Sequence, residues 1–261
     1  MRTVQELFDL SGQAALVTGG AGLLGTAISE SLAEAGARVA IASRNLDHCQ
    51  ETARKLGPDH LGLQLDIGSE ASNRDVVDEV AERFGRLDIL VNCAYTGPRP
   101  EIDVATADEF DEALHLSITA YFVASQQAAR HMRARGKGSI IQITSMYGVV
   151  GSYPEVYVGT GGGSPPTYHA GKGGLVHLTR YMAVYWAKDG IRVNAISPGP
   201  FPTPEGLRDE GEFYQRLANK VPLQRVGEPW ELKGATVFLA SDASSYVTGQ
   251  NLMVEGGWTI W

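Results

Sequence analysis

Short hydrophobic runs alternate along the chain with longer segments in which apolar and polar residues recur at the spacing of a helix. The short runs are nearly unbroken, as expected for strands buried on both faces of a parallel sheet. They predict seven strands, at residues 14–18, 38–42, 61–65, 88–92, 139–144, 191–196 and 251–255. The longer segments predict helices at residues 23–36, 69–85, 105–132 and 166–190.

The order of these elements predicts the fold class. Strands that alternate with helices form βαβ units with right-handed crossovers, which build a doubly wound α/β sheet with helices on both faces. We therefore expect a single domain over residues 1–261, with a mostly parallel seven-stranded sheet. No repeat or linker divides the chain, and a glycine-rich patch at residues 159–166 predicts a loop.

Composition and charge exclude several classes of function. The chain has 261 residues and a formal net charge of −8, and an acidic chain without basic clusters is a poor nucleic-acid binder. No run of about 18 apolar residues could span a membrane, and the first residues lack the apolar core of a signal peptide. Cys49 and Cys93 form no CxxC pair, which indicates a reducing compartment, so we expect a cytoplasmic protein. The six histidines show no HExxH or Cys/His spacing, so we expect no metal site.

The segment "TGGAGLLG" at residues 18–25 follows the first predicted strand and opens the first predicted helix. Its glycines satisfy GxGxxG, a spacing that lets the backbone turn tightly and approach a pyrophosphate at a helix N-terminus. A tight turn without a ligand is the alternative interpretation. We expect a dinucleotide site whose contacts include Gly19, Gly20, Gly22, Leu23, Leu24 and Gly25.

The end of the second strand bears on which dinucleotide binds. An NAD site typically places an acid there, whereas this chain has Ser43 and Arg44. Arginine pairs with a 2′-phosphate, so the sequence favours NADP(H), with NAD(H) still possible. Alternatively, Arg44 is a solvated loop charge.

Several motifs stand in a fixed order: "TGGAGLLG", "LDI" at 65–67, "NCA" at 92–94, "TS" at 144–145, "YHAGK" at 168–172 and "NAISPGP" at 194–200. With them the whole chain resembles the short-chain dehydrogenase/reductases of single-domain Rossmann type. Its cofactor half looks most like the sugar-acid and polyol dehydrogenases, such as gluconate 5-dehydrogenases. The resemblance implies an enzyme that transfers a hydride between a nicotinamide and an alcohol or carbonyl, and that is commonly a homotetramer.

The family's catalytic set falls on Ser145, Tyr168 and Lys172. Tyr168 would be the general acid/base, and Lys172, one helical turn away, would lower its pKa and hold the nicotinamide ribose. Ser145 would hold the substrate oxygen where charge develops. A solvated Tyr/Lys pair on a helix surface is the alternative.

Further cofactor contacts follow from the resemblance, although each could be an ordinary loop residue. Asp66 and Ile67 would flank the adenine, and Asn92 would order the turn after the fourth strand. The remaining expected contacts are Ala94, Pro198, Gly199, Phe201 and Thr203.

The chain departs from the family pattern in three places. Leu23 stands where the usual glycine loop has glycine, a spacing similar to that of the longer, nucleotide-sugar-modifying branch. Ser117 stands where the family often has a catalytic asparagine, so a role of Ser117 in proton relay is open. About ten residues are inserted near 150–166. Tyr147, Tyr153 and Tyr157, which follow Ser145 closely, either wall the substrate pocket or pack the insertion.

These features predict an NADP(H)-dependent oxidoreductase acting on a small secondary alcohol or ketone. A sugar acid, a polyol or a 3-oxoacyl compound is the expected substrate. The alternatives are an NAD-dependent dehydrogenase of the same family and a dinucleotide sensor without turnover. We expect a homo-oligomer, because residues 178–188 are apolar on more than one face. We also expect Trp258 and Trp261, at the C-terminus, to be exposed aromatic residues that form an interface or cover a pocket.

Overall fold

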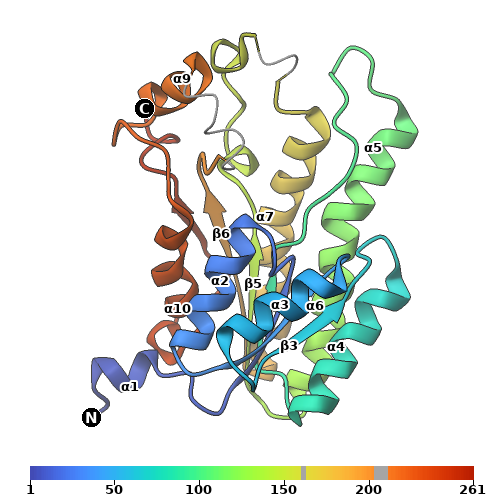
Figure 1. Ribbon diagram of the computed structural model, residues 1–261, viewed down its shortest axis with the longest axis vertical. Coiled ribbons are helices and arrows are strands. Elements are labelled where there is room, and N and C mark those ends of the chain that lie inside the picture. The colour runs from blue at the N-terminus through green and yellow to red at the C-terminus, as the bar shows by residue number, and fades with distance from the viewer. Residues whose placement is uncertain (160–162, 203–210) are drawn as a thin grey trace.

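The computed structural model describes residues 1–159, 163–202 and 211–261 (Figure 1). Its centre is a parallel seven-stranded sheet in the order β3-β2-β1-β4-β5-β6-β7, which confirms the predicted fold class. Each predicted run forms a strand, with ends shifted by at most two residues. The strands are β1 (Ala14–Thr18), β2 (Arg38–Ser43), β3 (Leu61–Gln64), β4 (Ile89–Asn92), β5 (Gly138–Ile143), β6 (Ile191–Pro198) and β7 (Asn251–Val254).

Helices cover both faces of the sheet (Figure 1). One hydrophobic core joins the sheet to α4 (Glu70–Phe84), α6 (Ala120–Arg133) and α7 (Pro166–Trp186). The core on the other face joins it to α2 (Leu23–Glu34), α3 (Leu46–Leu56) and α10 (Lys233–Ala240). The described residues also form the helices α1 (Val4–Phe8), α5 (Ala107–Leu114) and α9 (Glu212–Lys220).

The long helix predicted at residues 105–132 is divided. A π-helical turn, η1 (His115–Thr119), separates α5 from α6, and Ser117 is its buried residue. The Ser117 hydroxyl donates to the carbonyl of Ala113, one turn earlier, at 2.7 Å. A serine that bonds back to its own helix in this way loosens the regular ladder locally.

The strands are added outward from β1 to β3 on one side of the sheet and then from β4 to β7 on the other side. The strand order therefore reverses at β1, which pairs with β2 on one side and β4 on the other. Beyond the carboxyl ends of such a pair the connecting loops diverge, and a crevice opens between them. The loops that follow β1, β2, β4, β5 and β6 meet at this edge, which is the upper end of the molecule in Figure 1. The expected ligand site is therefore at this edge.

The insertion between the fifth strand and α7 packs against α9. Its 3₁₀ turn η3 (Pro154–Tyr157) is held by Arg216, which donates to the carbonyl of Val156 at 3.0 Å. Residues 160–162, which belong to the predicted glycine-rich loop, lie outside the described part of the chain.

Trp258 corrects one sequence expectation. Its side chain is fully buried in the aromatic cluster beneath the insertion, because the chain turns back under α9 after β7. Trp261 is exposed as expected, and its indole donates to the carbonyl of Lys220 at 2.9 Å.

Candidate active site

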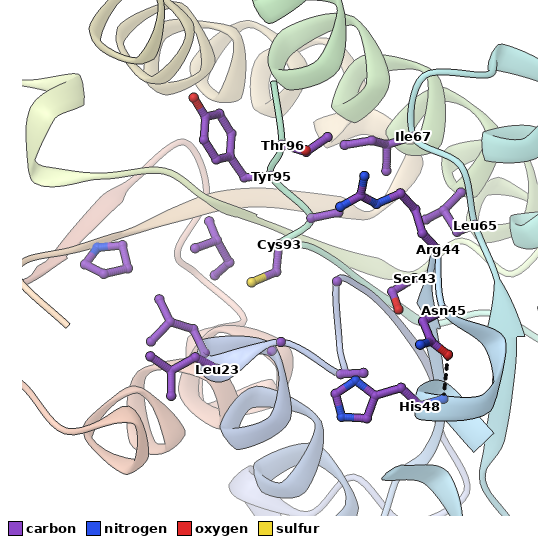
Figure 2. A pocket seen from close by; sticks show the side chains of 18 of the residues that line it. Leu23, Ser43, Arg44, Asn45, His48, Leu65, Ile67, Cys93, Tyr95 and Thr96 are labelled. Carbon is purple, nitrogen blue, oxygen red and sulfur yellow. Dashed lines mark hydrogen bonds between the residues drawn. The ribbon is translucent and has the colours of Figure 1, made fainter. Parts of the chain in front are cut away.

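A cavity of about 1190 Å³ opens at the carboxyl edge of the sheet (Figure 2). Ligand sites of doubly wound sheets form at this position. The cavity brings together most of the residues predicted as site residues. They are Gly19, Gly22, Leu23, Leu24, Gly25, Ser43, Arg44, Ile67, Ala94, Ser145, Tyr168, Lys172, Pro198, Gly199 and Phe201.

Other predicted residues do not line the cavity. They are Gly20, Asp66, Asn92, Ser117, Tyr147 and Tyr153, whose assignments as contacts stay predictions. Thr203 lies outside the described residues. Gly20 lies behind the loop, where an added Cβ would come within 2.9 Å of Ser29 Oγ. The Asp66 carboxylate accepts from the amide of Gly68 at 2.9 Å.

Asn92 is buried and links β4 to neighbouring elements through hydrogen bonds. Its amide donates to Ser125 Oγ and to Gln142 Oε1, both at 3.0 Å, and so joins β4 to α6 and β5. The turn after β4 is held by Thr18, whose hydroxyl accepts from the amide of Cys93 at 3.1 Å.

The loop after β1 forms a cradle that requires glycine. Gly19 has a φ of +68°, and an added Cβ there would come within 2.7 Å of the Ala94 backbone. Gly22 caps α2 without a side chain, so the first amides of this helix point into the cavity unopposed by a capping oxygen. A helix N-terminus without a side-chain cap leaves backbone amides free to bind an anion such as a pyrophosphate.

The opposite end of the cavity is formed by the residues after β2. Figure 2 shows Arg44 extending along the wall toward Ile67 and Thr96. Asn45 caps α3 by accepting from the amide of His48 at 3.0 Å, which turns the start of α3 toward the cavity. The carboxylate of Asp47, which was not predicted as a site residue, also lines this end.

Tyr168 lies at the start of α7, where Tyr95 meets its ring edge to face with centroids 5.0 Å apart. Burial raises the pKa of Tyr168, and a hydrogen bond with Ser145 partly offsets this rise. The loss of water around the phenol outweighs the favourable contacts, so this direction is opposite to the lowered pKa that the sequence predicts from Lys172. Ser145 Oγ also accepts from the amide of Tyr147 at 3.1 Å, which fixes its position at the end of β5.

Lys172 is almost completely buried, and its ammonium donates to the carbonyl of Ile143 at 2.8 Å. The Nζ atom lies 5.3 to 5.7 Å from the ring centroids of Tyr95, Tyr121 and Tyr168. Burial lowers the pKa of Lys172 to about 8. The lysine thus remains largely protonated at pH 7 and loses its charge in mildly alkaline solution.

Beside Tyr168 lies an aromatic cluster. Tyr147 stacks on His169 at a centroid distance of 4.8 Å and shares a hydrogen bond with the Tyr157 hydroxyl at 2.7 Å. Tyr153 lies against Trp258, with centroids 5.8 Å apart. Tyr147 and Tyr153 therefore pack the insertion, in the same cluster that contacts Tyr168.

Sequence reasoning missed several cavity residues on the loops after β2 and β4. Asn45, His48, Cys93, Tyr95 and Thr96 all line the wall. The available signal was their place just beyond predicted strands, at the edge where ligands bind. Burial raises the pKa of the Cys93 thiol to about 11, so this cysteine is a poor nucleophile near neutral pH.

The described part of the chain lacks two kinds of feature. None of its helices is long and apolar enough to cross a membrane. Across the same residues, no three His, Cys, Asp or Glu side chains gather in a way that could hold a metal ion.

Comparisons with known proteins cover nearly the whole chain. A family model described as Enoyl-(Acyl carrier protein) reductase matches residues 20–259. D-threitol dehydrogenase of Mycolicibacterium smegmatis is 34% identical over 100% of both chains. Gluconate 5-dehydrogenase of Gluconobacter oxydans is 35% identical over 98% of both chains.

A solved structure extends the similarity to three dimensions. Gluconate 5-dehydrogenase from Burkholderia cenocepacia, in complex with NADP and tartrate, is 34% identical with a TM-score of 0.87. The match covers 98% of this chain and 99% of that one.

Proposed function

The chain belongs to the short-chain dehydrogenase/reductase family, and from this we propose that it is an NADP(H)-dependent oxidoreductase acting on a secondary alcohol or ketone. One observation carries the proposal. A single cavity has the glycine cradle and Arg44 in one part of its wall, and Ser145, Tyr168 and Lys172 in another. A dinucleotide in this cavity would extend from the phosphate-binding residues to the acid–base group.

NADP(H) suits the charges of the cavity better than NAD(H). The exposed Arg44 provides a guanidinium at the end of β2, where a ribose 2′-phosphate would bind, and α3 begins beside it. The solved gluconate 5-dehydrogenase holds NADP, which supports the same choice here. The negative charge of Asp47 at this end would repel a 2′-phosphate, so the attraction of Arg44 for the phosphate has to exceed that repulsion.

The protein's own groups supply the proton chemistry and the positioning. When bound, the nicotinamide would accept a hydride from the carbinol carbon or deliver one to the carbonyl carbon. Tyr168 takes the hydroxyl proton during oxidation and returns it to the oxygen during reduction. Ser145 holds that oxygen, and its own position is fixed by the end of β5.

Lys172 has two roles in this proposal. One N–H holds the ammonium to Ile143, which leaves two further N–H groups to bind ribose hydroxyls. The positive charge near the Tyr168 ring favours the phenolate during oxidation. Because burial raises the pKa of Tyr168, its phenol stays protonated at neutral pH, ready to donate to a ketone.

The relatives narrow the substrate class. Their names specify a polyol in one case and a sugar acid in the other, so a polyhydroxylated substrate is favoured over a 3-oxoacyl compound. The tyrosine hydroxyls around Tyr168 agree with such a substrate.

The assembly and the location of the protein are parts of the same proposal. Tyr181, Val184 and Tyr185 are exposed on α7 and form an apolar face suited to a second copy of the chain. We expect a homotetramer, which light scattering at micromolar concentration tests. Cys49 and Cys93 are free thiols, in line with a cytoplasmic location, which stays a prediction.

The decisive experiment follows absorbance at 340 nm with NADPH or NADP+ and a panel of polyols, sugar acids, their oxo forms and 3-oxoacyl esters. Turnover with at least one alcohol or ketone, faster with NADP(H) than with NAD(H), supports the proposal. Tight cofactor binding without turnover of any member would instead indicate the dinucleotide sensor.

A further inference from the structure

The last three strands of the sheet are joined by a chain of side-chain hydrogen bonds. Its members are Thr144, which directly follows β5, Ser197 on β6 and Asn251 on β7. Thr144 Oγ1 and Ser197 Oγ lie 2.5 Å apart, and the Ser197 hydroxyl donates to Asn251 Oδ1 at 2.8 Å. Thr144 and Ser197 are almost completely buried, so water does not compete for these bonds. The contacts therefore hold the three strands in one arrangement.

The number of available protons gives this chain a direction. A hydroxyl has a single proton, and that of Ser197 is donated to Asn251. The proton in the short contact between Thr144 and Ser197 therefore belongs to Thr144. The amide oxygen of Asn251 is thus the acceptor that orders both hydroxyls, and each bond in the chain depends on the next.

Thr144 is also fixed to the backbone of β6. Its amide donates to the carbonyl of Ile196 at 2.8 Å, and its hydroxyl lies 3.1 Å from the same oxygen. The next residue is Ser145, which begins the 3₁₀ turn η2 (Met146–Gly148) and accepts from the amide of Tyr147. Because the peptide bond between them is planar, the position of Thr144 determines where the Ser145 side chain starts.

The two ends of this arrangement differ in their relation to the cavity. Thr144 and Ser145 line it, whereas Ser197 and Asn251 do not. A cofactor or substrate in the cavity would therefore not touch Ser197 or Asn251. The hydrogen-bond chain gives these two residues a route to the reacting groups, through Thr144 to Ser145.

We propose that Ser197 and Asn251 are positioning residues that, through Thr144, hold the Ser145 hydroxyl in the place from which it binds the substrate oxygen. The proposal rests on the oxidoreductase activity proposed above, in which Ser145 has this role. Its contact with the oxygen strengthens as charge develops, so a displaced hydroxyl loses transition-state stabilisation more than substrate binding. The alternative is that the chain joins three strands and contributes to stability alone.

Ser197→Ala removes the middle of the chain, and Ser139→Ala is its matched control. Ser139 is a buried serine near the start of β5, and its hydroxyl donates to the carbonyl of Leu239 at 2.8 Å. Both changes remove a buried hydroxyl from the sheet, but only Ser197→Ala breaks the chain to Ser145. Urea unfolding compares the stability of the two variants.

The two variants should differ in turnover with the best substrate of the panel. For Ser197→Ala, kcat should fall by about 10- to 100-fold, because a small displacement of a group at the reacting atoms has an effect of this size. KM for the substrate and the dissociation constant of NADPH should stay within about threefold of wild type, because the weakened contact belongs to the transition state. Ser139→Ala should keep the kcat of wild type. An equal fall in kcat for both variants, or a loss confined to KM, would overturn the proposal.

Asn251→Leu breaks the chain at its other end and serves if Ser197→Ala does not fold. Asn251 is only partly buried, so the sheet should accommodate the change. The variant should show the same lower kcat at an unchanged KM, with a smaller loss, because the contact between Thr144 and Ser197 persists. A kcat equal to that of wild type would count against the proposal.

Hydrogen exchange tests the position of Ser145 without turnover. The amide of Tyr147 donates to Ser145 Oγ at 3.1 Å, so its exchange with deuterium reports whether the serine stays in place. Mass spectrometry of the peptide that contains this amide should show exchange about 3- to 10-fold faster in Ser197→Ala, the effect of weakening one hydrogen bond, and no change in Ser139→Ala. Faster exchange in a protein that turns over no substrate would support the positioning and count against the proposed activity alone. Unchanged exchange in Ser197→Ala contradicts the positioning whether or not the protein turns over a substrate.

Discussion

The hydroxyl of Ser117 lies so close to the backbone of Gly171 that a Cβ at residue 171 would come within 2.6 Å of Ser117 Oγ. The contact joins the π-helical turn η1 to the helix that carries Tyr168 and Lys172. Ser117 Oγ has little freedom to move aside, because it also donates to the carbonyl of Ala113. The position of the part of α7 that carries Tyr168 and Lys172 thus depends on a small residue at each side of this contact.

Gly171→Ala should therefore destabilise the fold by about 1–3 kcal/mol relative to Gly173→Ala, the usual cost of overpacking a tight interior. Both changes gain the same helix propensity, but a Cβ at Gly173 would meet its nearest neighbour at an ordinary 3.6 Å. Urea unfolding measures the difference. Combining Gly171→Ala with Ser117→Ala should recover most of the loss, and equal stability of the two glycine variants would refute the contact.

Arg44→Ala should weaken NADPH binding by about 10- to 100-fold, the loss expected for a charge-assisted hydrogen bond to a phosphate. Binding of NADH should change much less, because NADH lacks the 2′-phosphate. Isothermal titration of both cofactors measures this. Arg54→Ala is the control, since Arg54 is exposed on the neighbouring helix α3 and does not line the cavity. An equal loss for NADPH and NADH would show that Arg44 supports the fold of the loop instead.

Lys172 should make the stability of the protein depend on pH in a defined direction. Its pKa is about 8 in the folded state, below its ordinary value of 10.5. Between these values the unfolded chain binds the proton that the folded chain has lost, so the lysine's contribution to the free energy of unfolding rises with pH.

The stability of wild type relative to Lys172→Met should accordingly increase by about 2–3 kcal/mol between pH 7 and pH 10, at 1.36 kcal/mol per pKa unit. Urea unfolding at the two pH values measures the change. Lys188→Met provides the control, because the Lys188 side chain is exposed on η4 (Ala187–Asp189). A gap between wild type and Lys172→Met that stays constant with pH would contradict the lowered pKa.

The sheet could be predicted from the sequence because its strands are buried on both faces and read as unbroken apolar runs. Helices α1, α3, α9 and α10 were not predicted from the sequence. In helix α3 the buried residues Cys49, Thr52 and Ala53 are small and partly polar, so the segment is weakly hydrophobic as a whole, although its apolar residues recur at helical spacing. Trp258 was wrongly expected at the surface, because sequence position near a terminus says nothing about the fold of the chain beneath α9.

The candidate site could be predicted where a residue belongs to a motif with a fixed place in the fold. The glycine cradle, Ser145, Tyr168 and Lys172 are of this kind, and all line the cavity. Tyr95 could not be found in this way, because the loop after β4 has no period and its path depends on tertiary packing. The pKa of Tyr168 was expected to be low from its lysine neighbour alone, before the effect of burial was visible.

The central claim is that Tyr168 is the acid–base group of an NADP(H)-dependent oxidoreductase, and Tyr168→Phe tests it most directly. The control is Tyr181→Phe, on the exposed side of the same helix α7. With the best substrate of the panel, kcat/KM for Tyr168→Phe should fall by at least about 100-fold, the usual contribution of general acid–base catalysis. NADPH affinity should stay within about threefold of wild type, because the tyrosine's ring remains. Turnover within tenfold of wild type, with cofactor binding intact, would contradict the account.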